Sequence, residues 1–96
     1  MDRMEYRKLV NGLDNDYCDC LNKETEEAQR EYLKGCLIAT NSIADKCLDD
    51  IDIKIDLETL IKWFDAMGDN ITPLMKGKKD AIGMCLFLLI GGGFVD

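Results

Sequence analysis

The residues of this chain that could do chemistry are its cysteines and its many carboxylates, because the sequence contains no histidine. Structural zinc sites usually pair their cysteines at a C-x₂₋₄-C spacing, often with histidine. Cys18 and Cys20 are separated by a single residue, and no second pair follows. We therefore predict no metal at this motif, and two unpaired thiols instead.

Two acid-rich segments begin like calcium-binding loops, one at Asp14 and one at Asp50. An EF-hand loop requires glycine at its sixth position and glutamate at its twelfth. Counted from Asp14, those positions hold Asp19 and Thr25, and the second segment fails in the same way. Both segments are therefore interpreted as solvated acids without a bound metal.

Catalytic motifs are missing as well. Histidine is the commonest general base, and no P-loop or G-x-S-x-G motif occurs in the chain. The glycines at 91–93 are not followed by a helix that could bind phosphate. A lone cysteine nucleophile or a carboxylate pair stays open as an alternative, but the sequence favours a protein that is not an enzyme, with no catalytic residue and no cofactor.

Negative charge is concentrated in the middle of the sequence. From Asp14 to Asp69 there are 15 acidic and 6 basic residues, a formal charge of 6 − 15 = −9, whereas the two ends together carry 6 − 4 = +2. The whole chain carries −7, with a pI near 4.5. Such a protein is repelled by nucleic acids and anionic lipids and attracted to basic protein surfaces. The expected partner is therefore a basic protein, with no direct binding of nucleic acid.

The acids fall into two blocks, and together they form the candidate partner-binding site. Offsets of three and four predict that Glu24, Glu27 and Glu31 share one helix face. Simple solvation is the alternative, since charged helix faces mostly support solubility. The candidate residues are Asp16, Asp19, Glu24, Glu27, Glu31, Asp49, Asp50 and Asp52.

The cysteine count and the start of the chain indicate a compartment. Five cysteines are an odd number, and the first eight residues are too charged for the opening of a signal peptide. Reduced thiols and a cytoplasmic location are therefore expected. Cys36 and Cys47 have apolar neighbours and should behave as small hydrophobic residues.

Ninety-six residues are enough for one domain, 1–96, and the spacing of apolar residues predicts an all-α bundle of about four helices. The first helix should run from about Asp2 to Leu13, where Gly12 and the acids at 14–16 end or bend it. The second should start at about Asp16 or Asn22 and continue to Leu48, with one apolar stripe along its length.

The segment from Asp50 to Asp56 alternates isoleucine with charged residues, which is typical of extended backbone. No second strand is evident to pair with it, so we expect an extended connector, with strand pairing between two chains as the alternative. The third helix should then begin at Asp56 as its N-cap and stop at Gly68.

The fourth helix should open with Thr72 as N-cap and Pro73 as its first residue, and continue to about Ile90. Residues 81–90 are all apolar or glycine, which predicts a helix buried on all sides at the centre of the bundle. This apolar run is shorter than the about 20 residues of a membrane-spanning helix. We therefore expect no membrane insertion, although a membrane role for this helix and a homo-oligomer interface on one of its faces are the alternatives.

From these elements we derive a list of core residues and a functional hypothesis. The hypothesis is an acidic interaction protein, in one form an inhibitor of a nucleic-acid-handling protein, by analogy with inhibitors that mobile elements encode. The alternative is a self-assembling helical homo-oligomer, using the fourth helix or the segment 51–55, with a small-ligand or structural role. The expected core includes Leu37, Ile43, Leu60, Phe64, Ile82, Leu86 and Leu89.

Overall fold

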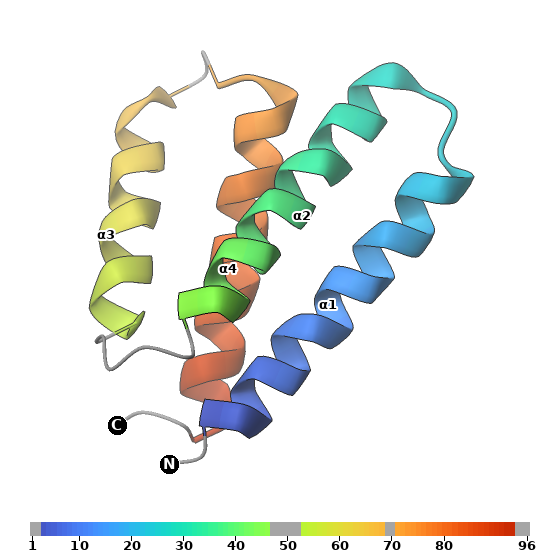
Figure 1. The fold of residues 1–96 in the computed structure, drawn as a ribbon. Coiled ribbons are helices and arrows are strands. Elements are labelled where there is room, and N and C mark those ends of the chain that lie inside the picture. Colours follow the sequence, from blue (N-terminus) through green and yellow to red (C-terminus); the bar gives the residue numbers. More distant parts are fainter. Residues whose placement is uncertain (1–2, 47–52, 69–70, 94–96) are drawn as a thin grey trace.

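The computed structural model describes residues 3–46, 53–68 and 71–93 (Figure 1). They form four helices: α1 (Arg3–Lys23), α2 (Glu27–Lys46), α3 (Ile53–Ala66) and α4 (Pro73–Gly91). No strand occurs among the described residues. The prediction of a compact all-α bundle of four helices is therefore confirmed.

Helix α1 is longer than predicted, because it continues past Gly12 and the acids at 14–16 as far as Lys23. Tyr6 and Val10 are buried, and Leu13 and Tyr17 pack against the same core at the next turns. Gly12 and Asp16 are exposed, whereas Asp14 is half-buried and accepts a hydrogen bond from the Thr40 hydroxyl of α2 at 2.6 Å. Packing of the inner face thus outweighs the roughly 1 kcal/mol that a helical glycine costs.

Helices α2 and α4 cross at two glycines. A Cβ atom built on Gly35 would overlap the carbonyl oxygen of Leu74, and one built on Gly77 would overlap that of Tyr32. The two backbones are therefore in direct contact, which only glycine allows. The Cys36 thiol donates to the Gly77 carbonyl oxygen at 3.3 Å, beside the same crossing.

Helix α3 begins at Ile53, so the prediction of an extended connector up to Asp56 is wrong for residues 53–56. Ile53 is partly buried, and Leu57 is 1% exposed one turn later. The isoleucines therefore belong to a helical stripe, and Asp56 lies in the first turn of α3 instead of capping it. The strand-pairing alternative fails for Ile53–Ile55 for the same reason, while Ile51 lies outside the described residues.

Local signals at the other helix ends are confirmed. The Thr72 side chain accepts a hydrogen bond from the backbone N–H of Met75 at 3.2 Å, and Pro73 follows as the first residue of α4. Gly68 adopts a positive φ of 64° just beyond the end of α3, which is the left-handed conformation of a helix stop.

Helix α4 contacts all three other helices. The prediction that it is buried on all sides is nevertheless wrong. Its inner face is buried through Ala81, Cys85 and Leu89. On the opposite face Phe87 is 67% exposed and Ile90 is 46% exposed. Three partner helices cannot surround a fourth one, so part of this apolar run faces the solvent.

The predicted core is largely confirmed. Ile43, Phe64, Ile82 and Leu89 are buried. Leu60 and Leu86 are half-buried and pack against that core. Leu37 is half-buried but lies outside the cluster, so its inclusion in the core was wrong. The sequence-based list omitted Tyr6, which is 2% exposed and donates its hydroxyl to the Cys85 carbonyl oxygen at 2.8 Å.

Candidate functional site

The predicted partner-binding acids lie mostly where α1 turns into α2, at one end of this helical hairpin (Figure 1). Asp16 and Asp19 are exposed on the second half of α1, and Glu27 is exposed at the start of α2. Glu31 is half-buried one turn later. The described acids of the first block therefore lie on both helices of the hairpin, and not on one helix.

The expectation that Glu24, Glu27 and Glu31 form one helix face is wrong. Glu24 lies in the loop between α1 and α2, where its carboxylate accepts the backbone N–H groups of Thr25 and Glu26 at 3.1 and 3.0 Å. Only Glu27 and Glu31 are neighbours on a helix, at an offset of four. The long predicted second helix is in fact two helices, and Glu24 organises the turn between them.

Arg30 fixes the geometry of this turn. Its Nη1 donates to the carbonyl oxygens of Leu21 and Glu24, both at 2.8 Å. These carbonyl oxygens lie at the end of α1 and just beyond it, where helices leave their last acceptors unsatisfied. Arg30 is thus engaged by the backbone, and the structure shows it in no ion pair with a described carboxylate.

We define the acidic hairpin end as the exposed residues Asp16, Asp19, Glu26 and Glu27. Within the described part of the chain, none of these four carboxylates lies in an ion pair, whereas the neighbouring Glu31 pairs with Lys34 at 3.2 Å. The positive charges of Lys23, in the last turn of α1, and Arg30 belong to the same end of the hairpin but form no ion pair with these four. An exposed group of like charges on two rigid helices can attract a basic surface.

The second acidic block is only partly described, because Asp49, Asp50 and Asp52 lie outside the described residues. Asp45 is exposed in the last turn of α2. Asp56, on α3, lies 3.9 Å from the Lys46 ammonium. Asp45 thus forms no ion pair with a described residue, whereas Asp56 is already paired with a lysine.

A group of tyrosine, cysteine and aspartate side chains lies where α1, α2 and α4 meet: Tyr17 and Tyr32 are half-buried, Cys36 is buried and Asp80 is exposed. The Tyr32 hydroxyl donates to Asp80 Oδ2 at 2.5 Å. Burial, followed by this hydrogen bond and the negative charge of Asp80, raises the pKa of Tyr32. Burial is also the main reason that the pKa of Tyr17 rises to about 12 and that of Cys36 to about 11.

Raised pKa values keep all three of these groups protonated at neutral pH. A cysteine nucleophile requires a lowered pKa, so Cys36 is not an activated thiol. Sequence reasoning missed this group, because its members are far apart in the chain and match no motif. We interpret it as part of the packing between the three helices.

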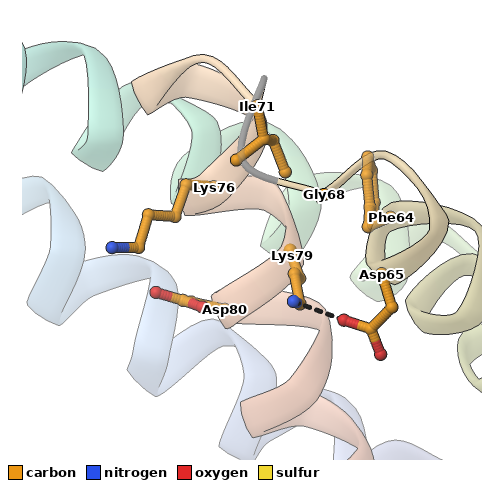
Figure 2. Close-up of a pocket in the computed structure, with 7 residues that line it drawn as sticks. All are labelled: Phe64, Asp65, Gly68, Ile71, Lys76, Lys79 and Asp80. Carbon is orange, nitrogen blue, oxygen red and sulfur yellow. Dashed lines mark ion pairs between the residues drawn. The ribbon is translucent and has the colours of Figure 1, made fainter.

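A cavity of about 450 Å³ lies between the end of α3 and the first turns of α4 (Figure 2). The Lys79 ammonium is paired with the Asp65 carboxylate across it. Lys76 and Asp80 add one positive and one negative charge to the wall, so the lining is close to neutral overall. Its lining residues are Phe64, Asp65, Gly68, Ile71, Lys76, Lys79 and Asp80.

The described residues contain neither a cluster of metal ligands nor a membrane-spanning helix. No group of three or more potential ligands among cysteine, aspartate and glutamate is close enough there to hold a metal ion. Cys18 and Cys20 are both exposed on α1. None of the described helices combines the length and the apolar character that crossing a bilayer requires.

Comparison with known proteins gives no relative from which a function could be transferred. No protein-family model matches the chain. No curated protein and no solved structure matches it significantly.

Proposed function

We propose that this protein is a non-enzymatic interaction protein, and that its acidic hairpin end docks on a basic surface of another protein. The observation that carries the proposal is a group of four exposed carboxylates that form no ion pair with any described residue, near an arginine whose guanidinium is engaged by backbone carbonyl oxygens. A surface that served solubility alone would gain from mixing charges of both signs.

Rigidity supports the same proposal. The Arg30 and Glu24 hydrogen bonds hold the turn between α1 and α2, so the backbone that carries the acidic residues on either side of it is held in place. Binding then requires little additional ordering of the chain, which is a favourable contribution to affinity. Asp19 also lies near the C-terminal end of α1, where a negative charge is unfavourable for the helix dipole. Helix stability alone therefore does not explain its presence.

The class of partner follows from the charge. Nucleic-acid-handling proteins carry the basic surfaces that phosphate groups normally occupy. Carboxylates displayed on two helices could occupy such a surface and block it, which makes an inhibitor the more specific form of the proposal.

The test is capture of partners from the source cell with the immobilised full chain and two charge-reversed variants. The first variant combines Asp16→Lys with Asp19→Lys, at the acidic hairpin end. The matched control combines Asp45→Lys with Glu58→Lys on α2 and α3, so that both variants change the net charge equally. A partner retained by the parent chain and the control, but lost by the first variant, supports the proposal.

The captured partner then allows two further measurements. Its association rate should fall steeply with added salt, because the encounter is steered by charge. A nucleic acid that binds the partner should compete with this chain for the same surface. The proposal fails if Asp16→Lys/Asp19→Lys binds the partner as tightly as the parent chain at low salt.

A second candidate function is self-assembly through the exposed face of α4. Phe87 is 67% exposed and, with Gly83, Leu86, Ile90 and Gly91, lines a shallow hollow of about 320 Å³. Light scattering after size-exclusion chromatography distinguishes the candidates. A dimer that Phe87→Glu converts to a monomer, and that Trp63→Glu on α3 leaves intact, would favour this second function.

A further inference from the structure

A separate hollow opens between α2 and α3, with α4 behind it. Helix α3 packs mainly against α4 and barely contacts α2, so the two helices leave a groove of about 220 Å³ between them. Its walls come from all three helices. The lining residues are Ile38, Ala39, Ser42, Ile43 and Lys46 from α2, Leu57, Leu60 and Phe64 from α3, and Lys78 and Ile82 from α4.

The walls of this groove are chemically uniform. Of the ten described residues that line it, seven have aliphatic or aromatic side chains, and the other three are Ser42 and two lysines. Ile38 lines the groove and is 46% exposed, so water contacts an apolar wall. Covering such a surface with an apolar ligand releases that water and is favourable.

The charges at the groove are opposite in sign to the net charge of the chain. The chain carries −7, yet among the described residues both charged residues that line the groove are lysines. Lys46 has Asp56 at 3.9 Å, a distance near the limit for an ion pair. Lys78 is half-buried, and no described carboxylate forms an ion pair with it. Its alkyl stem can line the groove while its ammonium stays available to an anion.

The size of the groove restricts what can occupy it. Drug-sized ligands fill pockets of about 300–1,000 Å³, which exceeds the space here. A protein helix, about 10 Å across with its side chains, is far too large. A single alkyl chain is slender enough, and a carboxylate at its end matches the ammonium of Lys78.

We propose that the groove between α2 and α3 binds a free medium-chain fatty carboxylate, with its alkyl chain on Ile38, Leu57, Leu60 and Ile82 and its carboxylate at Lys78. The occupant is a dissolved single-chain acid and not a lipid within a membrane. This site is distinct from the acidic hairpin end, so it stands or falls independently of the function proposed above.

The first experiment titrates the full chain with hexanoate, octanoate and decanoate below their micelle concentrations, by isothermal titration calorimetry. Each added methylene should strengthen binding by about fourfold, as expected for apolar burial. Decanol, which has a similar chain and no charge, should bind more weakly than decanoate. Equal binding of decanol and decanoate, or no binding of decanoate up to its solubility, would overturn the proposal.

Two variants locate the ligand. Lys78→Gln should reduce decanoate affinity to the level of decanol and leave decanol binding unchanged, whereas Lys62→Gln, on exposed α3 surface outside the groove, should change neither. Ser42→Phe should block both ligands by filling the groove. Ser42 is exposed, so this change should leave the circular dichroism spectrum intact. Undiminished decanoate binding in Ser42→Phe or Lys78→Gln would place the ligand elsewhere and refute the assignment.

The last experiment tests whether the protein co-sediments with vesicles of anionic phospholipid. The parent chain should not co-sediment with them, because its net charge is negative and the groove accepts one chain only. Vesicle binding that Ser42→Phe abolishes would show a membrane surface as the occupant, contrary to the proposal.

Discussion

Helices α2 and α3 both pack on α4, but they do so in opposite ways. At the α2–α4 crossing the backbones touch through Gly35 and Gly77, and no side chain separates them. Helix α3 is held by fewer buried residues, chiefly Leu57 and Phe64, and leaves an open groove toward α2. The difference shows that one small domain can combine a close-packed helix crossing, between α2 and α4, with a loosely packed helix, α3, that leaves room for a ligand.

The strongest way to break the tight contact is Gly77→Ala. The new methyl group would overlap the Tyr32 carbonyl oxygen, and backbone atoms cannot move aside without separating the helices. Overpacking usually costs 1–3 kcal/mol, and here we expect about 3 kcal/mol or more. Urea unfolding followed by circular dichroism measures this loss. A cost below about 1 kcal/mol would show that the two backbones are not in contact.

The looser contact should respond less to truncation. Leu57 is 1% exposed and lines the groove, so Leu57→Ala removes a buried side chain from a wall that already borders open space. Leucine-to-alanine changes cost about 2–5 kcal/mol, and we expect about 2–3 kcal/mol because the groove leaves room for collapse. Trp63, the single tryptophan, lies on α3 and reports this helix by fluorescence. Urea unfolding followed by this fluorescence measures the loss, and a loss larger than that of Gly77→Ala would contradict the looser contact.

Alkaline pH should weaken the contacts among α1, α2 and α4. The pKa of Cys36 is raised from 9.0 to about 11 and that of Tyr17 from 10.0 to about 12, in both cases mainly by burial. Above pH 9 the unfolded chain therefore loses protons that the folded chain keeps. This stability is fully present below pH 9 and is lost as the pH rises through 11 and 12.

Thermal unfolding between pH 8 and pH 12 checks this prediction. The melting temperature should begin to fall above pH 9, and Tyr17→Phe should reduce the fall above pH 10 because the variant lacks that proton. Helix α3 contains neither tyrosine nor cysteine, so Tyr17→Phe isolates a contribution from the contacts of α1. A melting temperature that stays constant to pH 11 would contradict the burial of Cys36.

The smallest expected effect is a gain in stability, whereas the changes described above all reduce stability. Gly83 lies in α4 on its outer side, where a Cβ atom would meet nothing within 4 Å. Gly83→Ala should therefore stabilise the protein by about 0.5–1 kcal/mol, since alanine is the better helix former. It is the matched control for Gly77→Ala, with the same substitution in the same helix. Destabilisation by Gly83→Ala would mean that this surface is packed against something.

Local sequence chemistry predicted what depends on neighbouring residues alone. Thr72 and Pro73 start α4, and Gly68 follows the end of α3, because caps and left-handed turns are settled within a few residues. The prediction ends the first helix too early, at about Leu13, because Gly12 and the acids after it disfavour helix formation locally. The packing of Tyr17 against the core, which carries the helix onward, is a tertiary contact.

The candidate site was predictable in its charge and not in its geometry. The acids of the first block are close together in the sequence, so their clustering at one end of a hairpin follows from the pattern. The position of Glu24 in a turn depends on where Arg30 donates its hydrogen bonds, which no spacing rule specifies. The glycine crossing and the groove depend on which helices pack against each other. That pairing cannot be predicted from individual glycines or isoleucines in the sequence.

The two thiols on α1 have a practical consequence for handling the protein. Residues two apart on a helix project about 200° from each other, so the Cβ atoms of Cys18 and Cys20 point to different sides. A disulfide between them would require the helix to unwind. Both thiols are exposed, so an oxidant would instead join separate molecules. Helix α1 alone offers two attachment points, and storage without a reductant should therefore produce ladders of covalent multimers on a non-reducing gel.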